Sequence, residues 1–396
     1  MKTVMVLGAS YLQTFAIKKV KEMGYRAVAL DGNPESVGFS DADSSYPCST
    51  TDREGVLAIA RKEKIDGIMT YASDVSAPAV AYVAEKLGLP TNPYESVVTM
   101  TDKSLTRRFM EKHGFNVPES AEAQSLSEAA AAAEKIGFPV IFKPVDSAGS
   151  KGVSRVDSPA EIEKAFLFAL DYSRSKRIIV EKFLVRKGHQ IDADCFMYDG
   201  ELVHFLPMDQ HRDEIAPYSP IGISAPSVLK DAKAELARAE VERFLKLLGM
   251  RFGEYNVEYL FDENDDFYLL EIGPRAGGNL IPDVIFRSAG LDLCRASVAA
   301  ALGEDCSSVR SLPYKKCVSS YIVHSQRDGE FAGIEYDESI ASGVVFEKLF
   351  VSPGEKIRRF SGAPDALGFS LIEFSDLETM MRVMDNTADY IRIRTK

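Results

Sequence analysis

The sequence predicts a mixed architecture, α/β near the N-terminus and α+β over the rest of the chain. Strand and helix patterns alternate through the first hundred residues, and pairs of apolar strands joined by turns follow after residue 138. Hydrophobic residues make up 45% of the 396 residues, enough for two to three packed domains of roughly 150 residues each. No segment approaches the roughly 18 unbroken apolar residues of a membrane helix.

Charge and cysteine content narrow the class of protein. The formal net charge of −12 repels nucleic acid and anionic lipid, so a phosphate ligand requires a local pocket. The five cysteines are scattered and the five histidines show no metal-site spacing, which favours neither a disulfide framework nor a zinc cluster. We expect a cytoplasmic protein that binds small molecules, with no nucleic-acid or membrane partner.

The first domain, residues 1–98, alternates between predicted strands and helices. Strands are expected over 3–7, 27–31 and 67–70, and helices over 12–23, 53–63 and the segment before residue 88. This order predicts a parallel sheet with helices on both faces. The turn at Gly8 and the acid Asp31 suggest a Rossmann-like dinucleotide site, but Leu12 and Gln13 stand where its glycines belong, which favours an architectural turn over NAD binding.

Two further domains are expected after a proline-containing linker at 90–93, one over 99–305 and a small α+β cap over 306–396. Between 99 and 305, strands are expected over 138–144, 153–156, 177–184, 190–197, 201–207, 255–261 and 267–273, and helices over 126–136 and 230–248. In the cap, strands are expected over 317–323, 344–351 and 369–374, and a helix over 377–390. The cap would complete a substrate pocket.

A glycine-containing loop at 146–152 joins two predicted strands. A P-loop requires a helix directly after its lysine, whereas Lys151 is followed by Gly152 and a strand. A hairpin tip that closes over phosphates with its N–H groups and Lys151 fits better; the alternative is an ordinary surface hairpin. Lys143 lies in the preceding apolar strand, where burial is costly unless an anion meets it; the alternative is that it snorkels to solvent.

Two glutamates are predicted to face each other across a hairpin. If Phe261 pairs with Tyr268, Glu258 lies opposite Glu271, whereas pairing Phe261 with Phe267 would place Leu270 there. Opposed like charges destabilise a sheet, so a cation between them is expected, and oxygen ligands suit Mg²⁺ or Mn²⁺. The alternative is an exposed sheet face with solvated glutamates.

An arginine follows directly after this hairpin. Arg275 and the pair Gly277 and Gly278 add an anion-binding fork and backbone donors. Together with Lys143, the glycine loop and the two glutamates, they form a set typical of phosphoryl transfer.

These motifs, in this order, resemble the ATP-grasp superfamily. The resemblance rests on Asp102-Lys103, the segments 137–144, 146–153 and 180–184, Asn256-Val-Glu258, and the run from Glu271 to Asn279. It covers residues 1 to about 305 and is closest to the carboxylate–amine ligase branch, which includes carbamoyl-phosphate-synthase-like proteins and L-amino-acid ligases. The Rossmann-like domain then corresponds to the N-terminal module of that family.

The resemblance implies a role for each matching residue. Lys103 and Lys143 would contact ATP phosphates in a cleft between two subdomains, and Arg275 would clamp the substrate carboxylate or its acyl phosphate. The loop residues that would fold over the phosphates are Ser147, Gly149, Ser150, Lys151 and Gly152. The adenine would be held at Glu181, Lys182, Phe183 and Leu184, the ribose at His189, Gln190 or Asp192, and Mg²⁺ at Glu258 and Glu271. Gly273 departs from relatives that carry a further asparagine ligand there.

The implied function is an ATP-dependent ligase that joins a carboxylate to an amine, with amino acids as expected substrates and a homodimer as a compatible assembly. The alternatives are a non-catalytic nucleotide-binding regulatory protein and an NAD-dependent oxidoreductase. Arg212 is a candidate for a second carboxylate clamp, although a solvated loop is the favoured interpretation of 211–214 and 218–226.

Overall fold

The N-terminal residues form an open parallel sheet with strand order β3-β2-β1-β4. In the computed structural model, which describes residues 1–396, its strands are β1 (Thr3–Leu7), β2 (Arg26–Asp31), β3 (Ser44–Pro47) and β4 (Gly67–Thr70), and its helices are α1 (Gln13–Glu22), α2 (Arg53–Glu63) and α3 (Ala77–Leu87). Alternate residues of β1 contact α1 on one face and α2 and α3 on the other. The predicted parallel sheet with two covered faces is confirmed, and β3 was missed.

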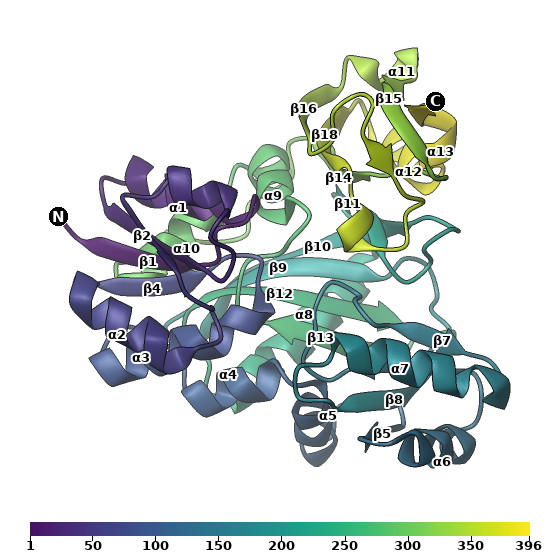
Figure 1. The fold of residues 1–396 in the computed structure, drawn as a ribbon, viewed down its shortest axis with the longest axis horizontal. Coiled ribbons are helices and arrows are strands. Elements are labelled where there is room, and N and C mark those ends of the chain that lie inside the picture. The colour runs from purple at the N-terminus through teal and green to yellow at the C-terminus, as the bar shows by residue number, and fades with distance from the viewer.

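One of two helices from much later in the chain completes this domain, while the other packs on an antiparallel sheet. α9 (Ile281–Ala289) and α10 (Leu293–Ala301) follow the predicted metal hairpin, and α10 packs against α1 and β4 (Figure 1). Cys294 and Val298 share a core with Val4 and Val6. The sequence prediction placed neither helix; the partners of α10 in α1 and β4 lie more than 200 residues away in the chain.

Asp283, in the first turn of α9, gives this junction a pH dependence. Burial raises its pKa from 3.8 to about 6. The folded state therefore keeps a proton that the unfolded chain releases, and its stability falls as pH rises from 4 through 6. We expect the Asp283→Asn variant to gain stability over the parent protein as pH rises from 4 to 8. Urea unfolding at pH 4, 6 and 8 tests this; a difference independent of pH would contradict it.

A second, antiparallel sheet of four strands has the order β5-β8-β6-β7. Its strands are β5 (Ser120–Ala123), β6 (Val140–Pro144), β7 (Ser154–Val156) and β8 (Ile178–Lys182). Helices α6 (Leu126–Ile136) and α7 (Ile162–Tyr172) share one apolar core with it, and Ser125 caps α6 by accepting from the Glu128 N–H. Helices α4 (Tyr94–Met100) and α5 (Lys103–Lys112) lead into this subdomain.

The third sheet has eight strands in the order β13-β12-β9-β10-β11-β14-β18-β16. They are β9 (Ile191–Tyr198), β10 (Glu201–Arg212), β11 (Pro220–Ala225), β12 (Gly253–Phe261), β13 (Phe267–Gly273), β14 (Cys317–Val323), β16 (Val344–Leu349) and β18 (Gly368–Phe374). Helix α8 (Asp231–Leu247) packs against the β9–β12–β13 part. Because β14 pairs with β11, the C-terminal residues continue this sheet, and residue 306 is not a sheet boundary.

The remaining C-terminal residues form a small sheet beside the large one (Figure 1). It contains β15 (Gly329–Tyr336), β17 (Lys356–Ile357) and β19 (Ile391–Thr395), with α11 (Glu338–Ala341), α12 (Leu377–Asp385) and α13 (Thr387–Tyr390). Short 3₁₀ turns occupy η1 (Val37–Ser40), η2 (Asp74–Ser76), η3 (Pro159–Glu161) and η4 (Ala363–Asp365). No helix reaches the length and apolarity needed to cross a bilayer.

Two sequence-based expectations for these regions are wrong. The helix expected over 377–390 is divided at Asn386, which has a φ of −134° and ends α12. The solvated loop expected around 211–226 is instead the end of β10 and all of β11, and His211 and Ser224 are buried there. Polar side chains that hydrogen-bond one another inside the sheet look like a loop in the sequence.

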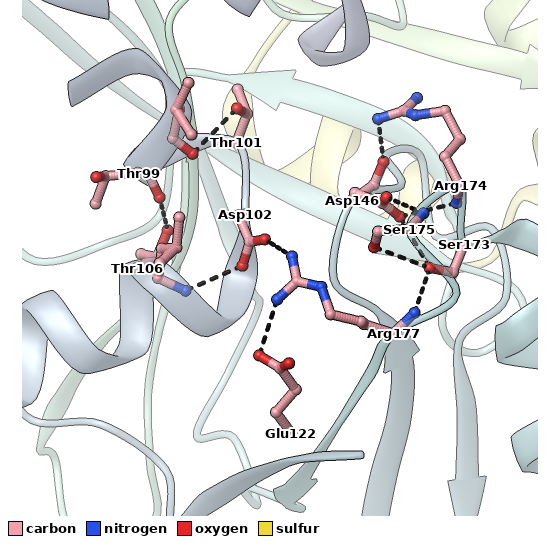
Figure 2. A network of polar contacts seen from close by, with 12 residues as sticks. Thr99, Thr101, Asp102, Thr106, Glu122, Asp146, Ser173, Arg174, Ser175 and Arg177 are labelled. Atoms are coloured by element: carbon pink, nitrogen blue, oxygen red, sulfur yellow. Dashed lines mark hydrogen bonds and ion pairs between the residues drawn. The ribbon is translucent and has the colours of Figure 1, made fainter. Parts of the chain in front are cut away.

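A polar network ties the glycine loop to the small subdomain. Figure 2 shows Arg177 donating to Asp102, which begins α5, and to Glu122 of β5 at 2.9 Å. Asp146, at the start of the loop, accepts from the Ser175 N–H at 2.7 Å and from the Ser173 hydroxyl at 3.1 Å. The base of the loop is thus fixed to the turn before β8.

Removing the Asp146 carboxylate should loosen this anchor. For the ATP site that the resemblance implies, we expect Asp146→Ala to raise the KM for ATP about tenfold, equivalent to the roughly 1.4 kcal/mol of one or two hydrogen bonds, because the closed loop would then be ordered by the nucleotide alone. Steady-state kinetics measures this, with Asp171→Ala on the exposed side of α7 as the matched control. An unchanged KM would show that the anchor does not govern the loop.

Candidate active site

The four-stranded sheet β5-β8-β6-β7 and the eight-stranded sheet enclose a cavity of about 350 Å³. Most residues singled out from the sequence line it: Lys103, Lys143, Ser147, Ser150, Lys151, Glu181, Lys182, Phe183, Leu184, Gln190, Glu258 and Glu271. They come from α5, β6, the glycine loop, the end of β8, the start of β9 and the hairpin β12–β13. Residues spread over 169 positions of the sequence therefore meet around one space.

Glu258 pairs directly with Glu271, but by a different register from the one expected. Phe261 pairs with Phe267, which in a regular ladder would set Leu270 opposite Glu258. A β-bulge between Glu258 and Tyr259 shifts the register by one residue and restores the Glu258–Glu271 pair. Bulges re-aim side chains near active sites; here the bulge turns both carboxylates towards the cavity.

The electrostatics of the pair fit a bound cation. Burial raises the pKa of Glu258 to about 8, and the charges of Asp192 and Glu271 add to the effect. The Nζ atom of Lys103 lies 3.1 Å from Glu271 Oε1, and the Gln190 amide donates to Glu258 Oε2 at 2.7 Å. Two facing carboxylates, one of them costly to ionise, suit a divalent cation that takes oxygen ligands.

Lys143 belongs to a buried ion-pair triad. Its Nζ lies 2.5 Å from one oxygen of Glu181, and Arg107 Nε lies 2.8 Å from the other. Burial alone would raise the pKa of Glu181, but the charges of Arg107 and Lys143 outweigh it and hold that pKa at about 2. The Glu181 side chain thus orients Lys143, which leaves the backbone of 181–184 as the part available to a base.

Arg107 is a functional residue that sequence reasoning missed. It is 3% exposed on α5 and also donates to the Leu270 carbonyl at 2.8 Å, at the bulge of β13. The only indication in the sequence was the position of Arg107. It lies four residues after Lys103, and therefore on the same face of a helix. One guanidinium connects the two sheets that form the cavity.

The tip of the glycine loop lies over the cavity. The Lys103 ammonium donates to the Ser147 carbonyl at 2.6 Å, and Ser150 and Lys151 line the same space. Gly149 and Gly152 instead line a neighbouring hollow formed with Phe168, Tyr172 and the C-terminal segment 358–365. Gly152 has a φ of +75°, and a Cβ there would lie 2.8 Å from the Pro144 ring, so this turn requires glycine.

Arg275 does not line the cavity. Its Nε and Nη2 atoms lie 2.8 and 2.5 Å from the two oxygens of Asp74, which comes from the N-terminal domain. A Cβ on Gly273 would lie 2.0 Å from Asp74 Oδ1, so the Asp74 carboxylate occupies the space of an asparagine there. The contacts of Arg275 give no support to the substrate clamp expected of it, and they show why position 273 is a glycine.

His189 also lies outside the cavity, and its ring contacts Asp385 of α12 at 2.8 Å. Of the three ribose candidates, only Gln190 lines the cavity, because Asp192 is 3% exposed and accepts from Gln210. Burial raises the pKa of Asp192 to about 7. The structure thus brings together all the predicted residues except His189, Asp192, Arg275, Gly149 and Gly152.

Several arginines that line the cavity carried no motif in the sequence. The Arg155 guanidinium lies 4.4 Å from the centre of the Phe183 ring, and Arg186 and Arg212 also line the cavity. Arg212 donates to the oxygens of Gln190, Gln210 and Pro217, none of them charged, and its Nε is buried with no partner. Arg212 forms no ion pair with a carboxylate, and only the more distant charges of Glu258 and Asp192 act on it, so its position favours an anionic ligand.

Comparisons with known proteins agree with this geometry. Residues 102–308, just over half of the chain, match the family described as carbamoyl-phosphate synthase L chain, ATP binding domain. A formate-dependent phosphoribosylglycinamide formyltransferase of Rhodococcus jostii is 27% identical, covering 92% of this chain and 90% of its own length. The C-terminal section of the Aquifex aeolicus carbamoyl phosphate synthase large chain is 28% identical over 74% of this chain, which spans about half (55%) of that relative.

Solved structures show the same fold over the whole chain. The L-amino acid ligase of Bacillus licheniformis superposes with a TM-score of 0.83 at 22% identity, covering 100% of this chain and 99% of its own. The phosphoribosylglycinamide synthetase of Anaerococcus prevotii gives a TM-score of 0.76 at 21% identity, with full coverage of both chains. The protein therefore belongs to the carbamoyl-phosphate synthase large-chain ATP-binding family, an ATP-grasp family of ATP-dependent ligases.

Proposed function

We propose that the protein is an ATP-dependent carboxylate–amine ligase that forms an amide or peptide bond. The observation that carries the proposal is the convergence of Lys103, Lys143 and the facing pair Glu258 and Glu271 on one cavity. In the reaction, a carboxylate oxygen attacks the γ-phosphorus of ATP to give ADP and an acyl phosphate. The amine then attacks the acyl carbon, and the phosphate leaves with that oxygen.

The residues of this chain supply charge control and positioning for such a reaction. Glu258 and Glu271 would hold Mg²⁺, which neutralises charge on the β- and γ-phosphates when bound. Lys143, oriented by Glu181, and Lys103, held by the Ser147 carbonyl, would contact phosphate oxygens. Closure of the loop 146–152 would keep water from the acyl phosphate. No side chain is required as a covalent nucleophile.

Arg212 is proposed to hold the substrate carboxylate in place of Arg275. Burial lowers its pKa to about 10, a sign of how poorly this position is solvated, yet the guanidinium stays charged at neutral pH. It lies beside Gln190, which contacts the metal-pair residue Glu258. A carboxylate bound at Arg212 would therefore lie next to the proposed phosphates.

The Arg212→Gln variant tests this placement. We expect the KM for the carboxylate substrate to rise about 100-fold, equivalent to roughly 2.7 kcal/mol for a charge-assisted contact, while the KM for ATP changes little. Arg275→Gln provides the comparison. Because the partner of Arg275 is Asp74, this variant should keep a KM for the carboxylate near that of the parent protein. The reverse pattern would return the clamp to Arg275.

The substrates can be found by measuring ADP release with each common amino acid, alone and in pairs, and with formate or ammonia added. The names of the relatives, an L-amino acid ligase and a formate-dependent formyltransferase, make amino acids and formate the first substrates to try. For an active pair, a carboxylate labelled with ¹⁸O should pass one labelled oxygen to the released phosphate. Tight ATP binding with no turnover across the panel would instead favour the non-catalytic regulatory alternative.

A further inference from the structure

Two histidines and an aspartate meet outside the ATP cavity. His189 precedes β9, His211 lies in β10, and Asp385 ends α12. His189 Nε2 and His211 Nδ1 each lie 2.8 Å from Asp385 Oδ1, and the three atoms lie within 4.8 Å of one another. We propose that these residues bind one divalent transition-metal ion of the Zn²⁺ type, at a site separate from the Glu258–Glu271 pair.

The donor set selects this class of ion. Two imidazole nitrogens and one carboxylate oxygen are a common three-residue ligand set for zinc, with water in the fourth position. Imidazole favours Zn²⁺, Co²⁺ or Ni²⁺, whereas Mg²⁺ takes oxygen ligands. Tetrahedral bonds of about 2.1 Å separate the ligand atoms by roughly 3.4 Å. The two nitrogen–oxygen spacings of 2.8 Å must therefore widen by about 0.6 Å, and all three ligand atoms already lie within 4.8 Å of one another.

His211 has a hydrogen-bond partner on its other ring nitrogen, as metal ligands usually do. Its Nε2 lies 2.7 Å from the Ser224 hydroxyl, which contacts Ser319 at 2.6 Å. The other nitrogen of His189, Nδ1, lies 4.0 Å from the buried carboxylate of Asp209, too far for a hydrogen bond but close enough for its charge to act. Nε2 of His189 and Nδ1 of His211 are thus both directed at Asp385.

The site is built for entry from one side. The His211 side chain is fully buried, His189 is 23% exposed and Asp385 is 42% exposed. The two histidines are therefore held by the sheet, while the carboxylate lies at the surface, where an ion and its remaining water can reach it. Asp385, the most exposed of the three ligands, is therefore the one that can move when an ion binds.

A metal here would fasten the C-terminal region to the wall of the ATP cavity. Gln190 and Arg212, which follow His189 and His211 directly in the chain, both line that cavity. Asp385 lies 174 residues after His211 and joins the site only because α12 packs on β10, β11 and β14. The ion would thus cross-link α12 to β10 and to the segment before β9, and restrain the residues proposed to meet the substrate.

Titration of the untagged, full-length protein with Co²⁺ tests the proposal, in the presence of excess Mg²⁺ to occupy carboxylate-only sites. We expect one equivalent of Co²⁺ per chain with the visible absorption of a four-coordinate site, displaced stoichiometrically by Zn²⁺. Zn²⁺ should also raise the Tm. No saturable absorption, or absorption typical of six-coordinate aqueous Co²⁺, would overturn the proposal.

Variants locate the site independently of catalysis. Asp385→Asn, a nearly isosteric change at an exposed position, should abolish the Co²⁺ signal and the Zn²⁺-dependent rise in Tm, and His189→Gln should do the same. Asp389→Asn, at an exposed aspartate of α13, is the matched control and should keep both. Glu271→Gln should also keep both, although it is expected to lose most of its ATP turnover. A signal that survives in Asp385→Asn and His189→Gln would overturn the assignment.

Discussion

Replacing Glu271 by glutamine should reduce ATP turnover about 10³-fold. The change removes one of two facing carboxylates and, with it, the metal that stabilises charge on the transferred phosphoryl group, a contribution of several kcal/mol, of which about 4 kcal/mol corresponds to 10³-fold in rate. The parent and the variant are compared by ADP release at saturating ATP over a range of Mg²⁺ concentrations. Part of the loss should be recovered at high Mg²⁺, because Glu258 remains.

Stability distinguishes this loss from misfolding. Glu271 is one of the charges that raise the pKa of Glu258, so its neutralisation relieves repulsion, and the metal-free variant should keep the Tm of the parent. Glu263→Gln, at an exposed position in the turn of the same hairpin, is the matched control and should retain full turnover. Turnover by Glu271→Gln at the rate of the parent would remove the metal role from this pair.

Local patterns were sufficient to predict most elements that position the site. The alternation of β1, α1 and β2, the capped helix α6 and the hairpin β12–β13 all depend on neighbouring residues, and the structure has them within a few positions of the expected bounds. The elements that were missed, such as β11, β15 and α10, are defined by partners far along the chain. Pairing with a distant strand leaves little trace in a short segment.

In the site, too, features that depend on neighbouring residues could be predicted, and features that depend on distant residues could not. The pairing of Glu258 with Glu271 was predicted from an assumed partner, Tyr268 for Phe261, that the structure does not have; the bulge that compensates is not visible in the sequence. The side-chain contacts of Arg275 could not be predicted for a different reason. A motif gives the residue type and its strand, whereas the guanidinium is directed by Asp74, about 200 positions away. Long side chains follow tertiary charges more than local pattern.

Replacing Glu181 by glutamine should have the largest effect on stability of any single change in the cavity. Glu181 and Arg107 are 5% and 3% exposed, and the Lys143 side chain is 12% exposed. Removing the one negative charge leaves two buried cations without a counter-ion, a loss of about 3–5 kcal/mol. The variant should also bind ATP weakly, because Lys143 loses the carboxylate that orients it, although bound ATP would restore part of the lost stability.

Urea unfolding as a function of pH identifies the cause of that loss. The pKa of Glu181 is held at about 2 in the folded state against an ordinary value of 4.5, so its stabilisation is complete above 4.5 and disappears as pH falls towards 2. The gap between the parent and Glu181→Gln should be full at pH 7 and narrow below pH 4.5. Asp157→Asn, which breaks the more exposed pair with Arg155, should cost less than about 1 kcal/mol. If Glu181→Gln cost no more than this control, the triad would be a surface-like ion pair, and the orientation of Lys143 would have to come from elsewhere.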